Sequence, residues 1–359
     1  MIYRAAAGLR ARARVLALIL LVLGLAASAT ACGAASGASS DGKTIRYQSY
    51  EGQVDLGELA DALGYLPGIK LDRVGDVQGG PQSLQALATG QTDTGAAFNG
   101  AIANVIANGT PIKAVVSYYG SNKDSYGEVL VKNGSPIKRP QDLIGKKVAV
   151  NTLGANLEAV LDTWFTKSGM TPDQIKQVTL VPLPSINSEA ALRNGQVDAA
   201  YLNGSLLQIA LKKGGLTPIV KDTDVVGDYN GGSICMSNSY LQEHPDAAKE
   251  FIGGMAKALH YTQTHSVADV LKVYDAYLQS HGRSDAVAAL SAWTGTGVAT
   301  DGGVIRDQDF STWTQWLQQK GLIHGSLDVP SLYTNQYNPY AGGTGRAGAS
   351  SGPSGTESN

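Results

Sequence analysis

The chain has 359 residues, of which 28 are Lys or Arg and 30 are Asp or Glu, so its formal net charge is −2. This mildly acidic balance argues against nucleic acid as a partner, because proteins that bind nucleic acid carry basic patches. The chain has two cysteines, and only Cys235 lies outside the N-terminal segment. We therefore expect the fold to be held by its apolar core rather than by disulfides.

The first 31 residues have the pattern of a secretory signal peptide. Four arginines precede an apolar run, residues 15–27, that is shorter than the roughly 20 residues a membrane-spanning helix needs. Small residues then lead to Cys32, a pattern that resembles the lipobox of bacterial lipoproteins, although Ala29 stands where Leu is usual. We expect Cys32 to carry the lipid anchor. The alternative is an ordinary signal peptide, with Cys32 incidental.

Removing residues 1–31 takes away four arginines and no acid, which lowers the 28 basic residues to 24 against 30 acidic ones. Residues 32–42 are small and polar, so we expect a flexible tether behind the anchor. This predicts a protein held on the outer face of the cell membrane. The tail, residues 336–359, is rich in Gly and Ser towards its end and is expected to be disordered.

A repeat at a constant offset of 105 residues organises the part between these ends. The string Ala86-Leu87-x-x-Gly90-Gln91-x-Asp93 recurs as Ala191-Leu192-x-x-Gly195-Gln196-x-Asp198. The same offset pairs Gly64 with Gly169, Pro67 with Pro172 and Ser83 with Ser188. Two copies of one folding unit predict two lobes.

Each copy predicts a helix, a strand, a second helix and a second strand. In the first copy these are residues 54–63, 69–74, 82–89 and 93–98. In the second they are 157–168, 177–182, 185–194 and 198–202. Alternation of helices and strands at this spacing indicates βαβ units on a parallel sheet. We expect the chain to cross into the second lobe after strand 126–131, through residues 137–148, and to return near 226–233. The helices that follow are expected to buttress the first lobe.

Two strings carry a family resemblance. Residues 141–150, QDLIGKKVAV, and residues 191–200, ALRNGQVDAA, resemble segments of ABC-transporter substrate-binding proteins. The chain is similar to the nitrate/sulfonate/taurine and thiamine-precursor (NMT1/THI5-like) group over residues 43–322.

The resemblance implies the α/β, type II periplasmic-binding-protein fold, with two lobes joined by a two-strand hinge that closes on a small molecule. It also implies a membrane permease as partner. We expect lobe 1 to comprise residues 43–132 and 232–335 and lobe 2 residues 133–231. We expect a monomer that binds a sulfonate, an aromatic acid or a pyrimidine-like molecule.

Ligands of open α/β sheets bind at the carboxyl ends of strands, near the N-termini of helices. This rule predicts ligand-binding residues in the loops after the expected strands. The candidates are Tyr50, Glu51, Gln82, Ser83, Phe98, Asn99, Tyr118, Asn151, Gly154, Ala155, Asn156, Tyr201 and Asn203. The loop at 154–156 opens a helix and offers free backbone N–H groups to an anion. Because Glu51 is the only charged candidate, an anionic ligand would rely on backbone donors.

An enzyme on the same fold, of the thiamine-pyrimidine or menaquinone-pathway type, is the rival interpretation. The five histidines all lie beyond residue 243, away from the expected cleft, and no Cys/His cluster is present. We therefore expect binding without catalysis, with no metal and no cofactor. A protein that presents its ligand to a sensor kinase is a third interpretation that the sequence leaves open.

Overall fold

The computed structural model describes residues 41–50 and 52–342. The expected signal peptide, the expected anchor at Cys32, most of the expected tether and Glu51 lie outside the described residues. Within the described part, no helix combines the length and the apolar character that crossing a membrane requires.

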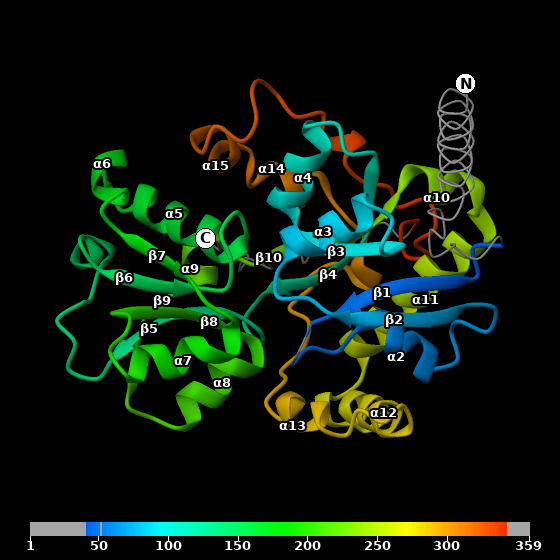
Figure 1. The fold of residues 1–359 in the computed structure, drawn as a ribbon, viewed down its shortest axis with the longest axis horizontal. Coiled ribbons are helices and arrows are strands. Elements are labelled where there is room, and N and C mark those ends of the chain that lie inside the picture. Colours follow the sequence, from blue (N-terminus) through cyan, green and yellow to red (C-terminus); the bar gives the residue numbers. More distant parts are fainter. Residues whose placement is uncertain (1–40, 51, 343–359) are drawn as a thin grey trace, which may run out of the picture. The chain divides into compact units, whose positions relative to one another are not determined.

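The first lobe alternates strands and helices along the chain (Figure 1). Its elements are β1 (Thr44–Ser49), α2 (Leu56–Ala62), β2 (Lys70–Asp76), α3 (Gly80–Ala88), β3 (Thr94–Phe98), α4 (Asn99–Ala107), β4 (Ile112–Ser121) and, much later in the chain, β10 (Tyr229–Ser237). Strands β1 and β2 are parallel, and β10 runs antiparallel between β3 and β4.

The second lobe has one five-stranded sheet in the order β7-β6-β8-β5-β9. Its elements are β5 (Gly127–Lys132), the 3-10 helix η1 (Pro140–Leu143), β6 (Lys147–Val150), α5 (Asn156–Lys167), α6 (Pro172–Ile175), β7 (Thr179–Pro182), α7 (Ser185–Arg193), β8 (Ala199–Asn203), α8 (Gly204–Lys212), β9 (Leu216–Lys221) and α9 (Asp222–Val226). Strands β6, β7 and β8 are parallel, and β5 runs antiparallel between β8 and β9.

The two copies of the repeat fold alike, which confirms the expected alternation. The predicted helices and strands correspond to α2, β2, α3 and β3 in one copy and to α5, β7, α7 and β8 in the other. In both copies the second helix ends at a glycine with positive φ, Gly90 at 72° and Gly195 at 73°. The N–H of the glutamine after each glycine donates to a carbonyl five residues earlier at 2.9 Å. These bonds form a Schellman motif, in which a glycine with positive φ ends the helix.

The aspartate of the repeat fastens the middle of each sheet. The N–H of Asp93 donates to the carbonyl of Arg46 on β1 at 2.8 Å, and its carboxylate accepts the Arg46 N–H at 2.8 Å. Asp198 makes the same pair of bonds with Lys147, at 2.9 and 2.8 Å. Asp93 also binds the Arg46 guanidinium at 2.7 Å. In both lobes the aspartate carboxylate accepts a backbone N–H that a carbonyl would accept in a regular strand pair. Strand β1 therefore lies beside β3 in the same way as β6 lies beside β8.

Two expectations about the sheets are wrong. The sheets are not all parallel, because β5 runs antiparallel within the five-stranded sheet of lobe 2 and β10 runs antiparallel between β3 and β4 in lobe 1, each immediately after the chain crosses between lobes. The second wrong expectation concerns the first crossing between the lobes. It lies at residues 122–126, between β4 and β5, and not within 137–148, because β5 already belongs to the sheet of the second lobe. The expected limit of lobe 1 at residue 132 therefore assigns β5 to the wrong sheet. The return crossing lies between β9 and β10, where it was expected.

The remaining elements contact both lobes. They are α10 (Asn238–Glu243), α11 (Pro245–Thr264), α12 (Val267–Ser280), α13 (Ala286–Leu290), the 3-10 helix η2 (Asp301–Gly303), α14 (Asp307–Ser311), α15 (Thr314–Gln319) and the 3-10 helix η3 (Val329–Ser331). Helices α11 and α12 pack on α2 and support the first lobe, as expected. Helix α15 instead contacts α4 and α5. Its Trp316 Nε1 donates to Asp162 at 2.9 Å, and Lys320 lies 2.5 Å from Glu158, so this segment also holds the second lobe.

The bonds that Asp93 and Asp198 make with the neighbouring strands, here called the aspartate clasp, predict a stability difference between the two lobes. We expect Asp93→Ala to lower the free energy of unfolding by about 3 kcal/mol, because it removes the acceptor of a buried N–H and of a guanidinium. Asp198→Ala removes the acceptor of one backbone N–H and should cost about 1 kcal/mol. Urea unfolding of the two variants measures both values.

Asp173→Ala is the matched control. The Asp173 side chain is 89% exposed and pairs only with the exposed Lys176, and surface pairs of this kind contribute less than about 1 kcal/mol. If Asp93→Ala unfolds at the same urea concentration as the Asp173 variant, the clasp does not stabilise the first lobe.

Candidate interlobe binding cleft

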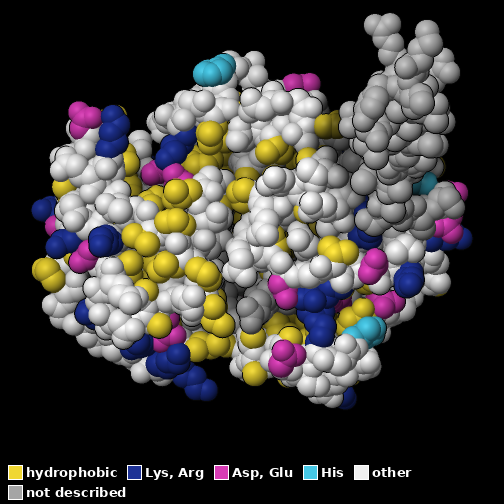
Figure 2. Space-filling model, in the orientation of Figure 1, with side chains coloured by type: hydrophobic (Ala, Val, Ile, Leu, Met, Phe, Trp, Pro, Cys, Tyr) yellow, Lys and Arg dark blue, Asp and Glu magenta, His cyan; other side chains and the backbone are white. Residues whose placement is uncertain are grey.

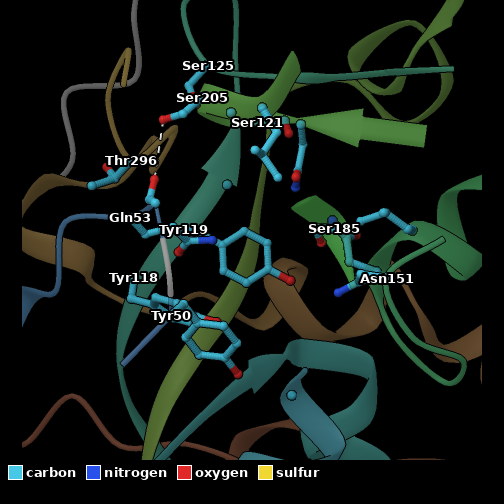
Figure 3. Close-up of a pocket in the computed structure, with 18 of the residues that line it drawn as sticks. Tyr50, Gln53, Tyr118, Tyr119, Ser121, Ser125, Asn151, Ser185, Ser205 and Thr296 are labelled. Atoms are coloured by element: carbon cyan, nitrogen blue, oxygen red, sulfur yellow. Dashed lines mark hydrogen bonds between the residues drawn. The ribbon is translucent and has the colours of Figure 1, made fainter. Parts of the chain in front are cut away.

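A cavity of about 200 Å³ lies between the two lobes (Figure 3). Its first wall belongs to lobe 1 and includes Tyr50, Gln53, Gln78, Gly80, Phe98, Tyr118, Tyr119 and Ser121. Its second wall belongs to lobe 2 and includes Asn151, Ala155, Asn156, Leu157, Ser185, Ile186, Asn203, Gly204 and Ser205. The first crossing adds Ser125 and Tyr126, and the segment after α12 adds Ala289, Trp293, Gly295 and Thr296. The Ser205 hydroxyl donates to the Gly52 carbonyl at 3.3 Å, which links the two lobes across the cavity.

Seven of the predicted ligand residues line this cavity. They are Tyr50, Phe98, Tyr118, Asn151, Ala155, Asn156 and Asn203. All of them stand at or just beyond the carboxyl end of a strand or at the start of a helix. Glu51 lies outside the described residues, between two residues that line the cavity. The described residues of the lining include no charged side chain.

Two predicted residues are buried where the fold uses their polar atoms. The Ser83 hydroxyl accepts the Ala96 N–H at 3.0 Å and joins α3 to β3. The Asn99 amide donates to the carbonyls of Asn230 and Asp309 at 3.2 Å each. Asn99 is fully buried, and Ser83 is 2% exposed. Both residues follow the predicted strands, but their side chains point into the core.

Three further predictions also fall outside the lining. Gln82 is exposed on α3, where its side chain accepts the Gln78 N–H at 3.3 Å. The N–H of Gly154 is taken by the Glu158 carboxylate at 2.6 Å. Tyr201 is buried, and its hydroxyl donates to Asp222 at 3.2 Å.

Several lining residues had no signal in the sequence. Trp293 and Thr296 come from a segment expected only to buttress lobe 1. Gln53 and Gln78 stand in loops next to predicted residues, and their amides carry no distinguishing pattern. Tyr119 follows the predicted Tyr118 on β4, and alternation along a strand would place only one of two neighbours on a given face, whereas both line the cavity.

Three tyrosines form the aromatic part of the first wall. The rings of Tyr50 and Tyr118 stack with centroids 6.3 Å apart, and Tyr119 meets Tyr118 edge-on at 4.8 Å. Figure 3 shows the Tyr50 and Tyr119 rings projecting into the cavity, opposite Asn151 and Ser185. Burial raises the pKa of all three hydroxyls above the usual value. The tyrosines therefore stay neutral, and the Tyr50 hydroxyl donates to the Ala96 carbonyl at 2.6 Å.

Two glycines of β10 give Tyr119 its position. A Cβ on Gly232 would lie 2.1 Å from a Tyr119 ring carbon and 2.4 Å from the Ala97 carbonyl oxygen. A Cβ on Gly231 would lie 2.5 Å from the same ring. The ring thus rests directly on the backbone of β10, at the point where the pairing of β10 with β4 shifts register.

Four helix N-termini border the cavity without a side-chain cap. These are the first turns of α3, α5, α7 and α8, of which the last three belong to lobe 2. The first N–H groups of a helix have no partner within the helix and carry the positive end of its dipole. On the lobe 2 wall, the Asn151 Oδ1 is a buried acceptor with no hydrogen-bond partner among the described residues. The cavity can therefore bind an oxyanion through backbone donors and a donor group through Asn151.

Charged side chains are kept away from these walls. Asp222 lies behind the cavity, and burial raises the pKa of its carboxyl group although Ser121 and the Gly127 N–H donate to it. On the face shown in Figure 2, the Lys and Arg side chains of the second lobe lie mainly at its outer margin. In residues 41–50 and 52–342, no cluster of His, Cys, Asp or Glu has the arrangement of a metal site.

The contact of Tyr119 with β10 yields a prediction. We expect Gly232→Ala to lower the free energy of unfolding by about 2 kcal/mol, because the new methyl group collides with a ring and a backbone carbonyl that cannot both move away. Chemical denaturation measures this loss, and the fluorescence of Trp293, which lines the same cavity, reports the displaced ring.

Gly253→Ala is the control. Gly253 lies within α11, where an added Cβ meets only the Tyr337 carbonyl oxygen at 3.8 Å. Alanine should raise the stability there by about 0.5–1 kcal/mol through its better helix propensity. Equal effects of the two substitutions would contradict the proposed support of Tyr119.

Comparison with known proteins identifies the family. Residues 59–268 match the family described as NMT1/THI5 like. The chain is 29% identical over 178 residues to the taurine-binding periplasmic protein of Escherichia coli (strain K12), covering 48% of this chain and 51% of that protein. It is 30% identical over 194 residues to a putative aliphatic sulfonates-binding protein of the same organism, covering 54% of each. The chain thus spans about half the length of these relatives.

Solved structures match over a larger part of the chain. The alkanesulfonate-binding protein from Xanthomonas axonopodis pv. citri bound to MOPS superposes with a TM-score of 0.62 at 20% identity, covering 81% of this chain and 98% of that one. A desulfurization enzyme superposes with a TM-score of 0.56 at 16% identity, covering 82% and 97%. Likeness at these identities concerns the fold. The chain belongs to the NMT1/THI5 like family and has the two-lobed fold of type II periplasmic binding proteins.

Proposed function

We propose that this protein is the extracytoplasmic solute-binding component of an ABC importer and captures a small organic molecule between its lobes. The observation that carries this proposal is the cavity walled by both lobes, in which helix N-termini and uncharged polar groups converge. A molecule that touches both walls favours the closed arrangement, because it binds that arrangement more tightly than an open one. The two E. coli relatives, described as binding proteins for taurine and for aliphatic sulfonates, support the same role.

The ligand we propose carries an oxyanion and a compact apolar or aromatic body, as in a sulfonate or an aromatic acid. The uncapped first turns of α5, α7 and α8 suit the oxyanion without any Lys or Arg in the described lining. The tyrosines of the first wall and Trp293 suit the apolar body. A pyrimidine-like ligand would use the amides of Gln53, Gln78 and Asn151 instead.

We propose lobe limits that follow the sheets, with residues 43–121 and 229–335 in lobe 1 and residues 127–226 in lobe 2. The crossings at 122–126 and 227–228 would then form the hinge. A lipid anchor at Cys32, a monomeric state and a membrane permease that receives the ligand complete the proposal. A ligand-presenting sensor protein would use the same cleft with a different partner.

The enzyme interpretation is kept as a second candidate, because a desulfurization enzyme shares the fold. Acid–base catalysis needs a titratable group near the reacting atoms. The described lining offers hydroxyls and amides but no His, Cys, Lys, Asp or Glu. This favours binding over catalysis.

A thermal-shift screen tests the proposal. Taurine, longer alkanesulfonates, aromatic carboxylates, amines and pyrimidines are the compounds to compare. A true ligand at 100 times its dissociation constant should add about 2.7 kcal/mol to the free energy of unfolding. We expect Asn151→Ala to need at least about ten times more ligand for the same thermal shift, because a hydrogen bond between the protein and a desolvated ligand is lost.

Gln82→Ala is the control, since Gln82 is exposed outside the cavity, and it should leave the shift unchanged. An equal loss in both variants would contradict the cleft as the binding site. Product formation from any compound that binds, followed by mass spectrometry, would overturn the binding-only function.

A further inference from the structure

A buried carboxylate sits where the two crossings between the lobes meet. Asp222 begins α9, directly after the last strand of lobe 2, and is 3% exposed. Ser121 ends β4 on the other side of the first crossing, and Gly127 begins β5 after it. One oxygen of Asp222 accepts the Ser121 hydroxyl at 2.7 Å and the Gly127 N–H at 2.9 Å. The carboxylate, on the last helix of lobe 2 before the second crossing, therefore bridges both ends of the first crossing.

The same oxygen is connected to the cavity wall. The Tyr201 hydroxyl of β8 donates to it at 3.2 Å, and the Tyr229 hydroxyl, at the start of β10, lies 3.5 Å from it. The Tyr229 hydroxyl also accepts the Asn156 amide N–H at 3.0 Å. Asn156 is the first residue of α5 and lines the cavity. An unbroken path of side chains thus runs from the hinge to the helix terminus that faces the ligand.

This site is built tightly. A Cβ on Gly127 would lie 2.5 Å from a Tyr201 ring carbon and 3.1 Å from the Asp222 oxygen, so the carboxylate reaches the Gly127 N–H only because residue 127 has no side chain. Tyr229 lies opposite Ser121 in the pairing of β10 with β4. Both lobe 1 partners of Asp222 therefore stand at one rung of the hinge.

We propose that Asp222 is a positioning residue that couples the hinge to the binding cleft, by joining Ser121 to Gly127 and by fixing the Asn156 amide through Tyr229. Opening of the lobes separates Ser121 and Tyr229 from Asp222, and the amide of Asn156 is then no longer held. The part of this proposal in which Asp222 contributes to the ligand site rests on the function proposed above, whereas the part in which Asp222 holds the hinge does not.

Hydrogen exchange of the protein without ligand tests the hinge. We expect Asp222→Asn to speed amide exchange at least about tenfold in residues 120–128 and at the start of α5, where Ala159 is the first residue whose N–H has a helical partner, because an amide is a weaker acceptor than a carboxylate and brings a donor among donors. Tyr229→Phe should speed exchange at the start of α5 alone, since Asp222 keeps Ser121 and Gly127. Asp224→Asn, an exposed change on the same helix, should alter neither region.

Two results would overturn the proposal. One is faster exchange spread evenly over both lobes in Asp222→Asn, which indicates a general loss of stability. The other is unchanged exchange at the start of α5 in both Asp222→Asn and Tyr229→Phe. Because the exchange experiment uses no ligand, its outcome can be interpreted even if no compound binds in the thermal-shift screen. A taurine titration of Tyr229→Phe adds the ligand arm: where wild type binds taurine, the variant should bind it about tenfold more weakly with little change in melting temperature.

Discussion

The arrangement of each lobe depends on one aspartate at the end of the repeat. Asp93 and Asp198, directly before β3 and β8, each hold a neighbouring strand with a backbone N–H and a carboxylate, at distances between 2.8 and 2.9 Å. The carboxylate supplies an acceptor at the amino end of the strand, where a backbone carbonyl could accept the same N–H only if the two strands ran side by side for another residue. Strands β3 and β8 are thereby aligned from their amino ends beside β1 and β6, and the loops at their carboxyl ends contribute to the cavity walls.

The cavity is completed by parts of the chain that belong to neither copy of the repeat. Trp293 and Thr296 close it from the segment after α12. Farther from it, α15 holds the opposite side of α5, where Trp316 and Lys320 bind the carboxylates of Asp162 and Glu158. Glu158 also accepts the Gly154 N–H just before α5. The helix whose first turn faces the cavity is therefore fixed at its N-terminus and along its outer face.

Much of this fold follows from local patterns in the sequence. The glycine that ends each helix and the aspartate that begins each strand are local features, and they predict the elements of both copies correctly. The rule that ligands bind at the carboxyl ends of strands finds residues such as Asn151 and Asn156 on the walls. The antiparallel strands β5 and β10 were not predicted as such, because strand direction depends on distant pairing and leaves no local pattern.

Three of the site residues that the sequence misplaced share one physical cause. Ser83, Asn99 and Tyr201 stand at the expected positions along the chain, but neighbouring backbone or carboxylate groups need their polar atoms. A sequence pattern predicts where a side chain begins and not which partner it takes. The C-terminal contributors, such as Trp293, come from a segment whose path over the cleft is set by tertiary packing.

The proposed binding site, whose described walls carry no charged side chain, places a particular demand on the hinge. A basic side chain attracts an anion over several ångströms, whereas a helix N–H acts only in hydrogen-bond contact, and the dipole weakens within the first turn. Affinity then depends on how closely both walls approach the ligand at the same time. In the proposed function, an open hinge leaves the ligand in contact with one wall alone, so closure adds to the binding free energy. Residues that set the closed geometry, including those behind the wall that never touch the ligand, thus contribute to affinity together with the lining.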